Sequence, residues 1–163
     1  MTSAPPVYLA SGSPRRRELL AQVGLVPTVL AVTVDETPRA GESAADLTCR
    51  LAAAKARAGR AQLAGPGVVI GADTAVALGG ELFGKPADAA DGVRMLARLS
   101  GRTHEVWSAV AVAEAGRERV ELSRSEVTFR VIEPAEAAAY WATGEPRDKA
   151  GGYAIQGLGA AFI

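Results

Sequence analysis

The residues best suited to chemistry begin at Ser11, where a Ser/Gly loop joins an apolar segment to an arginine-rich one. Residues 7–10 are typical of a short strand, and Pro14 suits the first position of the helix that follows. The three arginines at 15–17 then occupy the first turn, where the helix already carries partial positive charge and free N–H groups. Each is disfavoured there by about 0.3–1 kcal/mol, so the pattern indicates a bound anion, most simply a phosphate.

Helix geometry limits how many of these arginines can contact one ligand. Successive residues of a helix point about 100° apart, so at most two of the three can face the same phosphate. Arg15, nearest the loop, is the first candidate, and Arg16 is the second. The alternative is a basic turn that is merely solvated.

Asp73 is the candidate for acid–base or metal chemistry. It interrupts the run VVIGADTAVAL, Val68 to Leu78, which is typical of a strand buried on both faces. A carboxylate there is disfavoured by several kcal/mol unless a cation, a metal or hydrogen-bond donors compensate. Asp73 could therefore hold Mg²⁺ or deprotonate an attacking water, or it could be hydrogen-bonded in a local turn.

Four more polar residues have both a functional and an ordinary interpretation. Glu36 follows a predicted strand at Thr28–Val34 and could ligate a metal or simply be solvated. Lys55 and Lys85 could each contact phosphate, or extend into water as most lysines do. Gln156 lies in a glycine-rich segment, and its amide matches the imide edge of uracil or thymine, although a glutamine that bridges loops is equally compatible.

The remaining pattern alternates strands and helices. Ser43 and Asp46 predict a helix start, with the helix running to about Ala64 and an inward stripe at Leu47, Leu51, Ala54, Ala58 and Ala61. Further predictions are a hairpin at Gly79–Gly80, a helix capped by Asp88 and ending near Leu99, strands at Thr103–Ala113 and Arg119–Val131, and a last helix at Ala135–Thr143. His104 and Tyr140 are expected to be structural.

Composition excludes several classes of protein. The 163 residues carry 18 basic and 18 acidic side chains, so no broad basic surface for nucleic acid is expected. The single Cys49 excludes an intramolecular disulfide. No apolar run reaches the roughly 18 residues that a membrane span needs, and the first residues do not resemble a signal peptide, so a cytoplasmic protein is expected.

Five blocks of sequence, in order, resemble the Maf family of nucleoside triphosphate pyrophosphatases, once described as septum formation inhibitors. They are SGSPRRRELL, GADTAV, GELFGKP, LSGRTHEV and GEPRDKAGGYAIQGLG. The resemblance covers almost the whole chain and implies an α/β fold similar to inosine triphosphatase. That fold has a long, mixed, twisted sheet flanked by helices, with two lobes around a cleft. It implies one domain over residues 1–163, although the family pattern usually continues past the point where this chain ends at Ile163.

The resemblance also implies roles for individual residues. Asp73 would accept the proton, and Ser11, Arg15, Glu36, Lys55 and Lys85 would line the pocket for the triphosphate and a divalent metal, Mg²⁺ or Mn²⁺. Arg15, Thr74 and Gln156 occupy the positions that distinguish subfamilies, and they resemble the branch that acts on dTTP and UTP. A homodimer is implied as well. Two alternatives are an enzyme for another or modified nucleotide, such as 7-methyl-GTP, and a nucleotide-binding regulator of cell division without catalysis.

Overall fold

The computed structural model describes residues 5–163, which divide into two compact units. The first unit contains the described residues up to Asp73 together with Ser108–Ser123, and the second contains Thr74–Trp107 and Arg124–Ile163. The strands are β1 Val7–Leu9, β2 Thr28–Val29, β3 Val68–Leu78, β4 Glu81–Phe83, β5 Thr103–Glu114 and β6 Arg117–Thr128. The α-helices are α1 Pro14–Gln22, α2 Ala44–Arg60, α3 Ala89–Leu99 and α4 Pro134–Ala142, and the 3-10 helices are η1 Glu145–Asp148, η2 Ala150–Gly152 and η3 Leu158–Phe162.

The sheet is mixed, as the family resemblance implied. Within the described residues its strand order is β2-β1-β3-β5-β6, with β4 paired to β3. Strand β1 is parallel to both β2 and β3, whereas β4 runs antiparallel to β3 after the Gly79–Gly80 turn. Both turn glycines have positive φ, 59° and 85°, as a two-residue hairpin turn of this type requires. No helix in residues 5–163 is long and apolar enough to cross a membrane.

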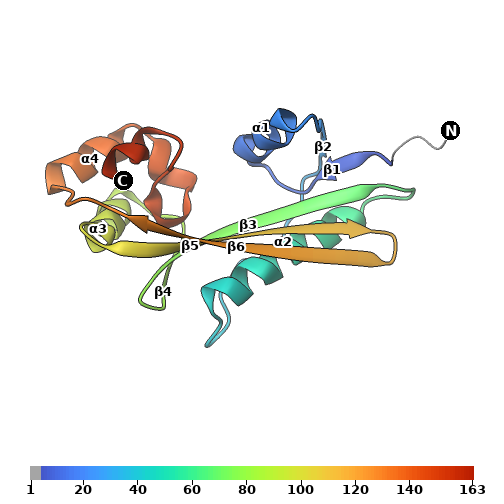
Figure 1. The fold of residues 1–163 in the computed structure, drawn as a ribbon, viewed down its shortest axis with the longest axis horizontal. Helices are drawn as coiled ribbons and strands as arrows, with labels where there is room; N and C mark the ends of the chain where they lie inside the picture. Colours follow the sequence, from blue (N-terminus) through green and yellow to red (C-terminus); the bar gives the residue numbers. More distant parts are fainter. Residues whose placement is uncertain (1–4) are drawn as a thin grey trace. The chain divides into compact units, whose positions relative to one another are not determined.

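In the first unit, α2 packs directly on the strands (Figure 1). Ala52, Ala53 and Ala56 of α2 form a core with the buried alanines of β5, at positions 109, 111 and 113. Gly71 of β3 lies so close to the helix that a Cβ there would come within 2.3 Å of the Ala52 carbonyl oxygen. Small side chains on both elements therefore bring the helix backbone against the strand backbone.

Two details of the first unit differ from the predictions. The strand predicted at Thr28–Val34 is only Thr28–Val29, because its parallel neighbour β1 is itself only three residues long. Helix α2 ends at Arg60 instead of Ala64. Its buried face contains Ala52, Ala53 and Ala56, whereas Ala54 and Ala58 are half-buried and Ala61 is exposed. The predicted stripe is right at Leu47 and Leu51, which are buried, but with alanines on every side of this helix the periodicity could not identify which alanines are packed.

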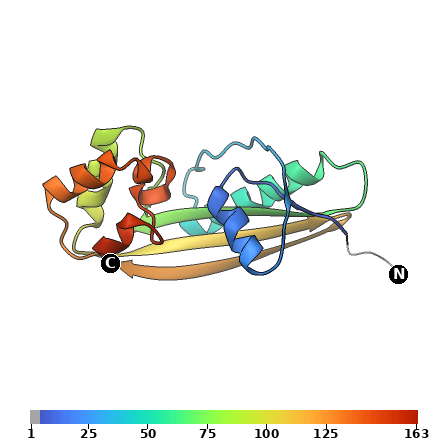
Figure 2. The same ribbon diagram turned by 90° about the horizontal axis from the view of Figure 1, so that it is seen from above.

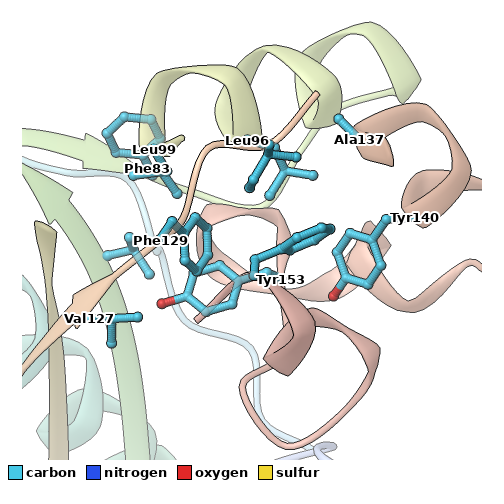
Figure 3. Close-up of a cluster of buried hydrophobic side chains, with 11 residues drawn as sticks. Phe83, Leu96, Leu99, Val127, Phe129, Ala137, Tyr140 and Tyr153 are labelled. Atoms are coloured by element: carbon cyan, nitrogen blue, oxygen red, sulfur yellow. The ribbon is translucent and has the colours of Figure 1, made fainter. Parts of the chain in front are cut away.

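The second unit is built around an aromatic cluster. Helices α3 and α4 lie beside the short C-terminal helices (Figures 1 and 2), and they contribute Leu96, Leu99, Tyr140 and Phe162 to the cluster. The ring of Phe129 lies beside that of Tyr153 (Figure 3), with their centroids 4.7 Å apart. The centroid of His104 lies 4.8 Å from that of Phe129. His104 Nε2 and the Tyr153 hydroxyl are 2.7 Å apart, which confirms the structural role expected for this histidine.

Candidate active site

Asp73 lies on the face of β3 that contacts α2. Side chains alternate along a strand, so Asp73 shares this face with Gly71, whose missing side chain makes room for the helix. Lys55 of α2 reaches down to it, and its Nζ lies 2.7 Å from Asp73 Oδ1. Both side chains are only 12% exposed, so this ion pair is mostly shielded from water.

A second carboxylate contacts the same ammonium group. Glu36, in the segment after β2, places Oε1 2.7 Å from Lys55 Nζ, and its side chain is 46% exposed. The Lys55 ammonium therefore joins a shielded carboxylate to a more accessible one. Removing either carboxylate would leave Lys55 with the other.

Burial sets the protonation behaviour of Asp73. Loss of hydration raises the pKa of this carboxyl above its usual 3.8, while the hydrogen bond from Lys55 and the charge of Arg16 act in the opposite direction. The nearby charge of Glu36 raises it further. A carboxylate with a raised pKa binds a proton more readily, which is the property a general base needs.

The loop between β1 and α1 brings a hydroxyl and an arginine together. Ser11 is buried, and its Oγ accepts hydrogen bonds from Ser13 N at 3.2 Å and from Arg16 Nη1 at 3.1 Å. Burial lowers the pKa of Arg16, and the charges of Asp73 and Glu36 oppose that shift. Arg16 therefore lies within electrostatic reach of both carboxylates. Ser11, Arg16, Glu36, Lys55 and Asp73 belong to one constellation in the first unit.

Arg15 has a different environment from Arg16. It is half-buried, and its Nε is buried without a hydrogen-bond partner. The third arginine of the turn, Arg17, is exposed. The first turn of α1 contains no acidic residue, and Ser13 caps the helix without a side-chain hydrogen bond. The N-terminus of α1 therefore keeps its partial positive charge. The phosphate contact proposed for Arg15 stays a prediction.

Glu36 and Asp73 are suitable ligands for a divalent metal. Mg²⁺ is typically bound by one or two carboxylates together with substrate phosphates, and Mn²⁺ also prefers oxygen ligands. These two carboxylates already converge on one cationic group, Lys55 Nζ. Residues 5–163 contain no group of three or more His, Cys, Asp or Glu side chains that could hold a metal alone. The two carboxylates thus fit a metal ion whose remaining ligands are phosphate oxygens of the substrate.

The other predicted site residues belong to the second unit. Thr74, Lys85 and Gln156 are all exposed. The loop that carries Lys85 is held by a hydrogen bond of 3.0 Å from Gly151 N to Gly84 O. The pKa of Asp148 is lowered by its hydrogen bond from Lys149 and, to a smaller degree, by the charge of Lys85. Gln156 lies between η2 and η3.

The ranking of Arg15 before Arg16 for phosphate contact stays a prediction, and the Ser11–Arg16 hydrogen bond could not be read from the sequence because it depends on the conformation of the loop. The sequence also indicated a structural role for Tyr140, without indicating which groups its hydroxyl would contact. Tyr140 is buried, as expected, but its hydroxyl makes two hydrogen bonds, to Glu145 and from Ala154. Glu145 had no signal in the sequence, because its other partners are backbone N–H groups 13 and 14 residues away.

Comparison with known proteins decides the family. A model of the Maf-like protein family matches residues 6–163. The chain belongs to the Maf family. This confirms the family resemblance and the mixed α/β fold that it implied. The match covers both compact units.

Several curated relatives are similar over most of the chain. A dTTP/UTP pyrophosphatase of Alcanivorax borkumensis is 52% identical over 158 residues, 96% of this chain and 82% of that protein. The dTTP/UTP pyrophosphatases of Saccharophagus degradans and Escherichia coli O157:H7 are 53% and 49% identical, each over 96% of this chain and over 76% and 80% of their own length. Among solved structures, a nucleoside-triphosphatase (dITP/XTP pyrophosphatase) from Mycobacterium abscessus matches with a TM-score of 0.49 and 23% identity, covering 76% of this chain and 74% of that one.

Proposed function

We propose that this Maf protein hydrolyses dTTP and UTP to the nucleoside monophosphate and pyrophosphate. The observation that carries the proposal is the shielded Asp73–Lys55 pair, 2.7 Å apart and within electrostatic reach of Arg16. Relatives that are about 50% identical to this chain carry the name dTTP/UTP pyrophosphatase. An ion pair of this kind is expensive to bury, and a role in chemistry explains why the fold retains it.

Binding of the triphosphate is assigned to the cations of the first unit. Arg16, already anchored by Ser11, and the free N–H groups of α1 can stabilise negative phosphate oxygens. Lys55 can exchange one of its two carboxylate partners for a phosphate oxygen and keep the other. Arg15 and Lys85 are further proposed contacts, on the strength of the family resemblance. These groups would stabilise the charge that develops on oxygen during the displacement.

Asp73 is assigned the role of general base. It takes a proton from water as the water oxygen bonds to the α-phosphorus, and the bond from that phosphorus to the oxygen bridging the β-phosphate breaks. Pyrophosphate leaves with the bonding electrons. Burial, which raises the pKa of Asp73, makes it a stronger base than an exposed aspartate.

A divalent cation, Mg²⁺ or Mn²⁺, bound by Glu36 and Asp73, would supply further positive charge to the phosphate oxygens. Recognition of the base is assigned to Gln156, whose amide offers a donor and an acceptor side by side. That pair matches the imide edge shared by thymine and uracil. Thr74 is proposed to contribute to the same selection.

The test is a panel of nucleotides with pyrophosphate release as the readout, with and without added Mg²⁺. We expect kcat/KM for dTTP and UTP to exceed that for dGTP and 7-methyl-GTP. Asp73→Asn should reduce kcat by about a thousandfold, because a positioned general base contributes roughly 10²–10⁴. Glu121→Gln, which neutralises an exposed carboxylate of the first unit, is the control and should retain activity.

Three results would contradict the proposal. Preference for 7-methyl-GTP would assign the chain to another substrate within the same enzyme class. Nucleotide binding without pyrophosphate release would favour a regulator that does not catalyse. Full activity of Asp73→Asn would remove Asp73 from the role of base.

A further inference from the structure

Two side chains hold the backbone around Gln156 by hydrogen bonds. One of them binds the backbone before Gln156, and the other binds the backbone after it. Gln156 is exposed, and it lies in the turn between η2 and η3. A side chain that distinguishes bases by hydrogen bonding needs a fixed backbone, because a mobile amide can match several base edges. The hydrogen bonds around Gln156 show what fixes it.

Before Gln156, the fixed point is the hydroxyl of Tyr140. Tyr140 lies on α4 and is only 5% exposed (Figure 3). Its hydroxyl oxygen accepts a hydrogen bond from Ala154 N at 3.0 Å, two residues before Gln156. The same hydroxyl donates to Glu145 Oε2 at 2.5 Å. Tyr140 therefore joins the start of the turn to Glu145.

After Gln156, the fixed point is the carboxylate of Glu145. Its Oε1 accepts from Leu158 N and its Oε2 from Gly159 N, both at 3.0 Å. Burial would raise the pKa of this carboxyl, but the hydrogen bonds from Tyr140, Leu158 and Gly159 hold it below its usual range. Glu145 is thus an ionised acceptor with two backbone donors beyond Gln156.

Gly157 shows how closely the carboxylate is enclosed. A Cβ at this position would come within 1.9 Å of Glu145 Oε1. The φ of Gly157 is −114°, outside the left-handed region, so an added side chain would be opposed by the Glu145 carboxylate, which would have to move to admit a Cβ. The Glu145 carboxylate therefore packs against the backbone of Gly157, the residue that follows Gln156.

We propose that the Tyr140–Glu145 pair positions Gln156 and thereby determines how well the enzyme distinguishes pyrimidine from purine triphosphates. The inference rests on the proposed function, in which Gln156 contacts the base. Tyr140 and Glu145 act through Gln156 and are positioning residues.

Tyr140→Phe is the first test, because it removes one oxygen atom and leaves the packed ring. It deprives Ala154 N of its acceptor and Glu145 of its side-chain donor, while the backbone donors of Glu145, Leu158 N and Gly159 N, remain. We expect the ratio of kcat/KM for dTTP to that for dGTP to fall about tenfold, which corresponds to about 1.4 kcal/mol, with most of the change in KM for dTTP. Gly157→Ala, which displaces the carboxylate, should lower the same ratio.

Tyr153→Phe is the matched control. Tyr153 is buried to a similar degree, in the same unit, but its hydroxyl bonds to His104. This variant loses the same atom and should keep the wild-type ratio. If Tyr140→Phe changes the melting temperature but not the ratio of kcat/KM for dTTP to that for dGTP, the Tyr140 hydroxyl has only a structural role.

A double variant tests whether the pair acts through Gln156. Gln156→Ala alone should lower the ratio, and adding Tyr140→Phe should lower it no further, because both changes remove the same contact. An additive loss would overturn the inference. So would a wild-type ratio in Tyr140→Phe. Failure of the proposed function is a distinct result, since the wild-type protein would then release no pyrophosphate from dTTP.

Discussion

The replacement of Asp73 by asparagine is expected to stabilise the fold while it removes activity. Burying the carboxylate destabilises the folded state by several kcal/mol, and its hydrogen bond from Lys55 stabilises that state by about 1.5–3 kcal/mol. Asparagine removes the first term and much of the second. Lys55 does not become an unpaired buried charge, because Glu36 remains 2.7 Å away. The net gain in the free energy of unfolding is about 1 kcal/mol, or a melting temperature higher by about 2–4 °C.

The stability difference between Asp73→Asn and the wild type should depend on pH. The pKa of Asp73 is raised above 3.8 in the folded protein. At pH values below 3.8 the carboxyl is protonated in both the folded and unfolded chains, so aspartate and asparagine should be nearly equivalent there. As the pH rises above that value, the unfolded chain ionises first and the wild-type fold loses stability relative to the variant. The advantage of asparagine should therefore grow with pH and then level off above the folded pKa.

Thermal melts of both proteins across this pH range are the assay. Asp148→Asn is the control, since its carboxylate is 72% exposed and its pKa is lowered instead of raised. This control should not raise the melting temperature at neutral pH. A lower melting temperature for Asp73→Asn than for wild type at neutral pH would refute the reasoning. It would show that pairing with Lys55 outweighs burial and that Asp73 anchors the fold.

Two further predictions concern stability. Gly71→Ala should lower the free energy of unfolding by about 2–3 kcal/mol in chemical denaturation, because its Cβ would lie 2.3 Å from the Ala52 carbonyl oxygen, whereas Gly65→Ala, with open space around it, should not. Burial lowers the pKa of His104 below 6.5, so the unfolded chain takes up a proton before the folded one does, and stability should fall as the pH drops below 6.5. His104→Gln should flatten that decline in melts at about pH 7.5 and about pH 5.5, and an unchanged decline would mean that other groups cause it.

Sequence reasoning predicted the features that have local causes. Strand β3 begins and ends at the predicted residues, Val68 and Leu78. Ser43 and Asp88 cap their helices by accepting from the backbone N–H three residues on, as their spacing indicated. The Gly79–Gly80 turn likewise follows from the conformations that only glycine adopts easily.

Features that depend on distant contacts were predicted less well. The length of β2 is set by its neighbour β1, and the buried face of α2 is set by how closely Gly71 lets the helix approach. In the site, residue types identified Glu36, Lys55 and Asp73 as candidates, but their convergence on one ammonium group required the fold. The roles of all the proposed site residues, and the organisation of residues 1–163 as a single domain, stay predictions.

The contact of Gly71 with the backbone of α2 has a consequence for how the site can evolve. Where a layer of large side chains separates a helix from a sheet, exchanging those side chains can slide one element along the other. Here the Ala52 carbonyl oxygen lies against the strand itself, so that adjustment is blocked. The distance between the backbones that carry Lys55 and Asp73 is therefore fixed by contact between main-chain atoms. The contact at Gly71 does not involve the segments that carry Ser11 and Glu36, so substitutions there leave this spacing unchanged.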